Sequence, residues 1–169
     1  MIHKKAHVEG AKVGEGTKVW QFASVVRGAV VGQNCTIAAN AIVDGSSLGD
    51  RCLVGHGAGI HPGAQIGNDV FVGPGAVICN DAWPRAHKRG FDAQALSVVI
   101  EDGASIGAQA VILPGVAIRA GAMVAAGAVA SRDVPARHLL LANGQMSLIV
   151  DEEERVAKRS RRGKVRIAA

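Results

Sequence analysis

Aromatic side chains are nearly absent from this chain. Its 169 residues include no tyrosine, two tryptophans and three phenylalanines, although 49% of the residues are hydrophobic. This hydrophobic content is enough for one domain with a real core, and small and β-branched side chains must fill that core. The chain has 22 glycines against five prolines and no collagen-like period, which indicates an architecture with many tight turns.

Cysteine is scarce as well. Cys35, Cys52 and Cys79 are odd in number and form no CxxC pair, so neither a disulfide framework nor a zinc knuckle is indicated. The first ten residues contain no apolar signal-peptide core. The most apolar stretch, Ala122 to Ala130, is too short to cross a bilayer and is interrupted by glycine. We therefore expect a cytoplasmic protein with no membrane insertion.

The net positive charge comes largely from the C-terminal end. Residues 1–150 contain 12 Lys or Arg and 10 Asp or Glu, whereas residues 151–169 contain 7 and 4. No aromatic residues are interleaved with the basic residues of this tail, so it does not read as an RNA-binding segment and no nucleic-acid partner is expected. The sequence predicts one domain over residues 1–150 and a charged tail over residues 151–169, helical or disordered.

Apolar residues recur at intervals of six. This interval matches neither the two-residue period of a strand nor the 3.6-residue period of a helix, but it is typical of a short strand plus a turn, stacked repeatedly. All but one of the eighteen anchors are Val, Ile or Leu. They form three blocks: Val13, Val19, Val25, Val31, Ile37 and Val43; Leu48, Val54, Ile60, Ile66, Val72 and Ile78; Ile100, Ile106, Ile112, Ile118, Val124 and Ala130.

The residue four positions after each anchor gives an independent test, because a narrow solenoid needs a small inward side chain there. Within the blocks this position holds only Ala, Cys, Thr or Val. Cys35 and Cys52 both occupy it, so we expect them to be stacked core residues with no redox or metal role.

The repeat resembles the hexapeptide-repeat, left-handed parallel β-helix of the acyltransferase superfamily, in which three hexapeptides make one triangular coil. The resemblance supplies the hand, since general rules for parallel strands favour right-handed connections. Eighteen hexapeptides predict an all-β prism of about six coils.

Two irregularities interrupt the repeat. Val43 and Leu48 are one residue too close, which predicts a tightened corner, whereas Ile78 and Ile100 are 22 residues apart. About 16 residues, near 81–97, must therefore leave the prism as an external loop, and loops of this length are usually functional. The prism is expected to end in a closing turn, an exit strand and the short C-terminal extension.

The loop resembles that of the hexapeptide-repeat N-acetyltransferases that acetylate 3-amino groups of nucleotide-linked sugars. The matching pairs are Gly73-Pro74, Asn80-Asp81 and Pro84-Arg85. The resemblance implies a homotrimer that uses acetyl-CoA, bound between neighbouring prisms, and a UDP- or dTDP-linked amino sugar for a surface polysaccharide such as lipopolysaccharide. No metal is expected.

The resemblance also implies roles for particular residues. The pantetheine arm of acetyl-CoA would contact Ala108, Ala126 and Gly127, and Arg132, Lys88 and Arg89 are candidates for the phosphates. In the loop, Trp83 either stacks on the nucleotide base or anchors the loop, and Arg85 is a candidate for the pyrophosphate.

Counting coils predicts a general base. One coil is 18 residues, or 17 across the short corner, so Asp44, His61 and Cys79 should stack on one side of the prism. A histidine oriented by a carboxylate suits proton abstraction from an amine near neutral pH, with Asn80 or Asp81 holding that amine by hydrogen bonds. The alternative is that His61 is an exposed corner residue and that the thiolate or solvent takes the proton. His56 is a weaker candidate that reaches a site through the neighbouring subunit.

Rival interpretations use the same prism. A γ-type carbonic anhydrase would bind zinc through three histidines, and His56 and His61 have the spacing of two of them. The third ligand should lie near residues 42–44, where the chain has no histidine. An O-acetyltransferase or a non-catalytic scaffold could also be built on the same repeat.

Overall fold

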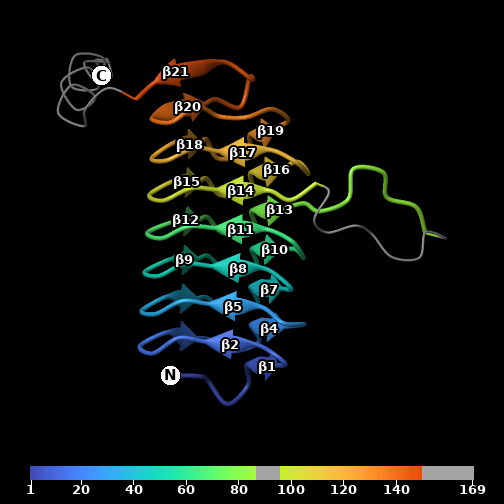
Figure 1. The fold of residues 1–169 in the computed structure, drawn as a ribbon, viewed down its shortest axis with the longest axis vertical. Helices are drawn as coiled ribbons and strands as arrows, with labels where there is room; N and C mark the ends of the chain where they lie inside the picture. The colour runs from blue at the N-terminus through green and yellow to red at the C-terminus, as the bar shows by residue number, and fades with distance from the viewer. Residues whose placement is uncertain (87–95, 150–169) are drawn as a thin grey trace, which may run out of the picture.

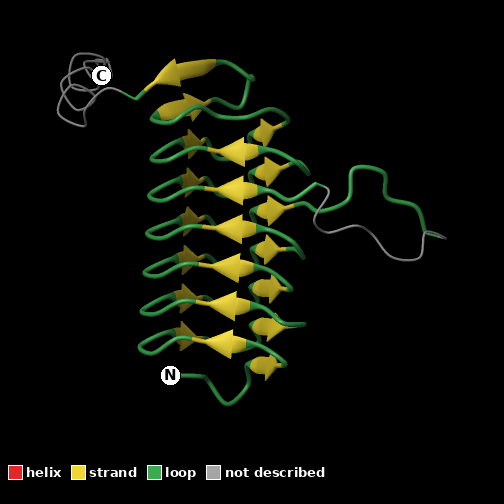
Figure 2. Ribbon diagram, viewed as in Figure 1, coloured by secondary structure: helices red, strands yellow, loops and turns green. Residues whose placement is uncertain are grey.

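The computed structural model describes residues 1–86 and 96–149, and all of the regular structure in these residues is β-strand (Figure 1). Twenty-one short strands stack into three sheets that form the sides of a prism, as Figure 2 shows. We call them sheets A, B and C, and the chain passes through them in the order B, C, A in each turn.

Each of these strands is two or three residues long, and their bounds follow the six-residue period. Sheet B contains β1 (His7–Glu9), β4 (Ser24–Val26), β7 (Ile42–Asp44), β10 (Gly59–Ile60), β13 (Val77–Ile78), β16 (Val111–Ile112) and β19 (Val129–Ala130). Sheet C contains β2 (Lys12–Val13), β5 (Val30–Val31), β8 (Ser47–Leu48), β11 (Gln65–Ile66), β14 (Val99–Ile100) and β17 (Ala117–Ile118). Sheet A contains β3 (Lys18–Val19), β6 (Thr36–Ile37), β9 (Leu53–Val54), β12 (Phe71–Val72), β15 (Ser105–Ile106), β18 (Met123–Val124), β20 (His138–Leu140) and β21 (Met146–Leu148).

The predicted parallel β-helix is confirmed, and its register follows the anchors. In sheet B, for example, Val43 pairs with Ile60 and Ile60 pairs with Ile78, all in parallel. The prism has about seven turns, one more than predicted, because β1 adds a coil whose apolar residue, Val8, precedes the first anchor by only five residues. The left hand stays a prediction from the resemblance.

The core is a set of inward columns with almost no large aromatic content. The anchors are buried, apart from Val13, which is partly buried at the N-terminal end. The predicted stacking of Cys35 and Cys52 is confirmed, since both are buried and the backbone N–H of Cys52 donates to the Cys35 sulfur at 3.4 Å. Such narrow columns leave space only for small and β-branched side chains, which explains the composition.

The C-terminal end of the prism closes as the sequence suggests. Val134 forms an isolated bridge with Ile118, β20 continues sheet A, and β21 pairs with β20 in the antiparallel direction. No helix in residues 1–86 or 96–149 has the length and apolar character needed to cross a membrane. The predicted tail, residues 151–169, lies outside the described residues.

Candidate functional site

The external loop leaves the prism between β13 and β14, at the column of turns that joins sheet B to sheet C (Figure 1). We call this column the loop corner. The sheet register places Asp44, His61 and Cys79 in successive coils there, immediately after Val43, Ile60 and Ile78. The coil count therefore predicted this juxtaposition correctly, because a fixed repeat length determines which residues of neighbouring coils lie side by side.

Asp44 has a different partner from the predicted one. Its residue is only 5% exposed, and both carboxylate oxygens accept hydrogen bonds from the guanidinium of Arg27 in the preceding coil. No hydrogen bond joins the side chains of Asp44 and His61 in the described part of the chain. Arg27 has a φ of 54°. Its VVRG segment resembles the arginine motif of the γ-type carbonic anhydrases, but a six-residue period does not show that its side chain turns toward Asp44. The Arg27–Asp44 pair thus stabilises the turn beneath His61.

His61 is half-buried at the end of β10. Burial lowers the pKa of its imidazole, and the positive charge of Arg27 lowers that pKa further. Both causes disfavour the imidazolium ion. At neutral pH the ring is therefore uncharged and able to accept a proton.

The first residues of the external loop are polar, and they follow Cys79 in the coil after that of His61. Asn80 and Asp81 follow Cys79 directly, and one carboxylate oxygen of Asp81 accepts the backbone N–H of Trp83 at 2.9 Å. The guanidinium of Arg85 donates to the Pro84 carbonyl at 2.8 Å. Trp83 is 74% exposed, so it does not anchor the loop to the prism. Lys88 and Arg89 lie outside the described residues.

A second site candidate follows the column of turns that joins sheet A to sheet B, which we call the groove corner. Trp20, Leu53 and Phe71 line a groove of about 500 Å³ there, together with Gln21 and His56. Small residues form the remaining lining: Thr36, Ala38, Ala39, Gly55 and Pro74. Sequence reasoning missed this groove, although large apolar residues at outward strand positions, such as Leu53 and Phe71, were the available signal.

The residues predicted to bind the pantetheine arm lie farther along the groove corner. Ala108 and Ala126 occupy equivalent turns of successive coils, and the backbone N–H of Gly127 donates to the Ala108 carbonyl at 2.9 Å. Arg132 is not part of this column: it follows β19, so its backbone lies at the loop corner, and its guanidinium donates to the Gly144 carbonyl at 3.1 Å, in the turn between β20 and β21. The groove and these turns thus form one continuous column along the prism.

His56 and His61 do not come together. His56 is exposed in the groove corner, whereas His61 lies in the loop corner, and β10 separates them. Within residues 1–86 and 96–149, no group of three His, Cys, Asp or Glu side chains is arranged to hold a metal ion. Near the predicted third ligand position, the carboxylate of Asp44 is already paired with Arg27.

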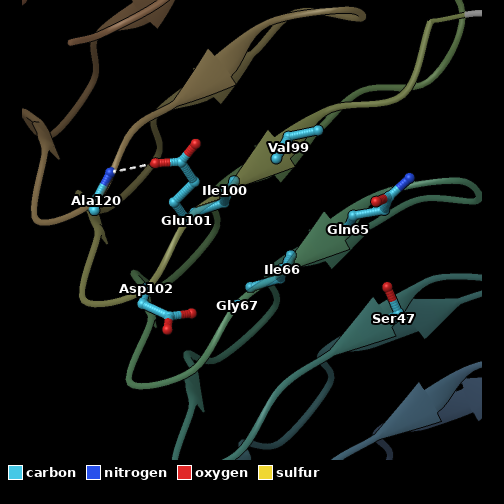
Figure 3. A pocket seen from close by; sticks show the side chains of 9 residues that line it. All are labelled: Ser47, Gln65, Ile66, Gly67, Val99, Ile100, Glu101, Asp102 and Ala120. Atoms are coloured by element: carbon cyan, nitrogen blue, oxygen red, sulfur yellow. Dashed lines mark hydrogen bonds between the residues drawn. The ribbon is translucent and has the colours of Figure 1, made fainter. Parts of the chain in front are cut away.

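A third hollow, of about 560 Å³, lies on the outer face of sheet C (Figure 3). Its two carboxylates already have partners. Glu101 binds Arg119 at 2.8 Å and accepts the backbone N–H of Ala120 at 2.9 Å, and Asp102 accepts the backbone N–H of Asn68 at 2.7 Å. These contacts tie successive coils together, so we assign the hollow a structural role.

Comparison with protein families agrees with the fold. The model described as "Bacterial transferase hexapeptide (six repeats)" matches residues 10–45 and 45–80, and "Hexapeptide repeat of succinyl-transferase" matches residues 97–131. The chain belongs to the bacterial transferase hexapeptide-repeat family.

Curated relatives are longer proteins. The bifunctional protein GlmU of Thermodesulfovibrio yellowstonii is 27% identical over 128 residues, which cover 76% of this chain and 26% of the relative. GlmU of Polaromonas naphthalenivorans is 32% identical over 162 residues, covering 94% of this chain and 32% of the relative. The chain thus spans about a quarter to a third of these relatives.

Solved structures share the fold at low sequence identity. The acetyltransferase domain of PglB from Neisseria gonorrhoeae matches with a TM-score of 0.61 and 22% identity, over 85% of this chain and 54% of that one. A single-residue variant of AntD, an N-acyltransferase from Bacillus cereus, in complex with dTDP-4-amino-4,6-dideoxyglucose and coenzyme A, matches with a TM-score of 0.67 and 15% identity, over 88% of each chain. A variant of perosamine N-acetyltransferase from Caulobacter crescentus, in complex with CoA and GDP-perosamine, matches with a TM-score of 0.53 and 23% identity. The match covers 86% of this chain and 55% of that one.

Proposed function

We propose that this protein transfers the acetyl group of acetyl-CoA to the amino group of a nucleotide-linked amino sugar. The observation that carries the proposal is His61, a half-buried imidazole with a lowered pKa, at the corner where a long loop interrupts an acyltransferase prism. Structural neighbours that bind coenzyme A together with nucleotide-linked amino sugars support the choice of substrates.

The proposed reaction is direct attack of the amine on the thioester. The nitrogen lone pair forms a bond to the acetyl carbon, the carbon–sulfur bond breaks, and the electron pair leaves with the coenzyme A sulfur. The attacking nitrogen must lose a proton, which neutral His61 accepts and later passes to the thiolate or to solvent. Asn80 or Asp81 would hold the amine by hydrogen bonds, since both lie at the base of the loop.

The groove corner is the proposed path for acetyl-CoA in a homotrimer. Ala108, Ala126 and Gly127 present small side chains, so a pantetheine arm can lie close to the backbone between two prisms. Arg132 starts from the loop corner, but its guanidinium reaches the β20–β21 turn at the C-terminal end of the prism, where it would be available to the phosphates. His56, in the groove of the same corner, would then face the site of the neighbouring subunit.

Three finer features belong to the same proposal. The acceptor carries its amino group at C3 and a UDP or dTDP nucleotide, and the product serves surface polysaccharide synthesis. The loop motif Asn80-Asp81 and Pro84-Arg85 supports the C3 position, whereas AntD was solved with a 4-amino sugar.

Release of free thiol from acetyl-CoA tests the proposal. The purified protein is offered UDP-, dTDP- and GDP-linked sugars with an amino group at C3 or C4, and matched sugars with a hydroxyl group at that carbon. We expect turnover with 3-amino sugars and none with the matched hydroxyl sugars. Turnover only with hydroxyl acceptors would establish an O-acetyltransferase instead, and turnover only with 4-amino sugars would move the specificity to C4.

A further inference from the structure

Gly59 is an exception in the outer face of sheet B. The equivalent outward positions in neighbouring strands hold Ile42, Val77, Val111 and Val129. Gly59 is not among the glycines with a positive φ, so its backbone does not require glycine. A glycine inside a strand costs stability and often marks a place where another group approaches closely.

The group that approaches Gly59 is the imidazole of His61. A Cβ built on Gly59 would lie 3.2 Å from Nε2 of His61, and 3.7 and 3.9 Å from two ring carbons. Residues 59 and 61 point to the same side because outward and inward positions alternate along a strand. The ring therefore folds back over β10 and occupies the space that a side chain at position 59 would take, and Gly59 is itself buried.

We propose that Gly59 is a positioning residue for His61, because the missing side chain provides the seat in which the imidazole lies against the sheet. This inference rests on the proposed function, in which His61 accepts the proton of the amine. Nε2 is the ring atom nearest to the Gly59 position, so it lies over the outer face of sheet B at the level of β10, the strand between those of Ile42 and Val77. An acceptor amine held on that face would meet this nitrogen.

Seating the ring also helps to keep it uncharged. Burial is the larger cause of the lowered pKa of His61, and Arg27 is the second. Among the described residues, the other titratable groups that follow the adjacent strands β7 and β13 at this corner are Asp44, which is paired with Arg27, Cys79, whose thiol pKa is raised by burial, and Asp81 at the start of the loop. A ring displaced from the seat would be hydrated and would regain a pKa closer to its ordinary value.

Substitution of Gly59 tests the seat directly. Gly59→Val introduces the residue found at positions 77, 111 and 129 of the same column, so the strand should tolerate it. Gly59→Ala is a milder change, because its Cβ requires the His61 ring to shift by only a few tenths of an ångström. Val129→Ile is the matched control, since it enlarges the same column three strands away from β10. Nuclear magnetic resonance titration of the six histidines, with the His61 signal assigned from His61→Asn, reports the pKa of the ring without requiring activity.

We expect Gly59→Val to raise the pKa of His61 and to lower kcat between roughly 10-fold and 100-fold, as expected for a displaced catalytic group. KM for acetyl-CoA should stay the same, Gly59→Ala should give smaller changes of the same sign, and Val129→Ile should change neither quantity. An unaltered His61 titration in both Gly59 variants would show that Gly59 does not position the His61 ring, and would overturn the proposal. A shifted titration with unaltered kcat would show that Gly59 positions a histidine that does not act in catalysis. If His61→Asn were then fully active, the assignment of His61 as the base would be wrong, whereas the positioning of its ring by Gly59 would stand.

Discussion

At the scale of single residues, the pH dependence of activity should report on His61. Its pKa is lowered in the folded protein, so below the ordinary value of about 6.5 the unfolded chain binds more protons than the folded one. The stability associated with the neutral ring is therefore present above that value and is lost as pH falls through the window between the ordinary and the lowered pKa. Activity should follow the folded-state value.

We expect the acid limb of kcat/KM to lie below the ordinary imidazole pKa, and His61→Asn to lower kcat by about 100-fold with little change in KM. The measurement is a pH profile of wild-type enzyme, His61→Asn and His7→Asn, where the last is the control with an exposed histidine outside both corners of the proposed site. An acid limb at or above pH 6.5, or a His61→Asn enzyme that keeps most of its kcat, would contradict the assignment of the base.

The Arg27–Asp44 pair should matter more for stability than for chemistry. Asp44→Asn leaves a buried side chain without its charge-assisted hydrogen bonds, which we expect to lower the free energy of unfolding by about 1.5–3 kcal/mol. Its effect on kcat should be smaller than that of His61→Asn, because Asp44 contacts Arg27. Urea denaturation measures the first quantity.

Asp69→Asn is the matched control, since Asp69 also binds an arginine in a bidentate manner but both partners are more than half exposed. Exposed pairs contribute little, so this variant should lose less than about 1 kcal/mol. Equal losses of unfolding free energy in the two variants would show that burial of Asp44 does not strengthen its contribution to stability.

At the scale of the elements, the shortened corner between Val43 and Leu48 forces a compromise. Ser46 takes the inward position that Ala29 and Ala64 occupy in the neighbouring coils, and its buried hydroxyl has no hydrogen-bond partner within the described residues. A buried hydroxyl without a partner costs about 1–3 kcal/mol. We expect Ser46→Ala to raise the melting temperature, with exposed Ser47→Ala as the unaffected control; a lower melting temperature would mean that the hydroxyl has a stabilising contact.

The external loop is the element that should distinguish the two substrates. Replacing residues 81–97 by a six-residue connection removes Asp81 and Arg85 but leaves the groove corner unchanged. Calorimetry should then show loss of acceptor binding and unaltered affinity for coenzyme A. Loss of both affinities in a variant with the original oligomeric state would place coenzyme A beneath the loop.

The sequence predicted the elements better than the side-chain contacts. A six-residue period dictates which residues stack, so the coil, the core columns and the Asp44–His61–Cys79 column followed from spacing alone. The partner of Asp44 depends on the left-handed conformation of Arg27, with a φ of 54°, and the seat of His61 depends on a ring folding back over Gly59. Neither is encoded in a period, because both depend on how a turn directs one side chain.

At the scale of the whole molecule, the exposed apolar residues indicate where prisms meet. Trp20, Leu53 and Phe71 are each 40 or 41% exposed and line one groove, which a single prism would leave in contact with water. In the proposed homotrimer a neighbouring prism covers this corner and encloses acetyl-CoA. The groove should therefore control assembly and cofactor affinity together.

We expect analytical ultracentrifugation to give three times the chain mass of 17.3 kDa. Leu53→Glu places a charge in the groove, and burying an unpaired charge is unfavourable, so the variant should dissociate to monomers and bind acetyl-CoA at least about tenfold more weakly, a loss of ~1.4 kcal/mol. Val30→Glu is the matched control, because Val30 is also an exposed strand residue, 46% exposed, but lies on sheet C away from the groove. A wild-type monomer, or a Leu53→Glu protein that remains trimeric and binds acetyl-CoA normally, would show that the groove is not the surface between subunits.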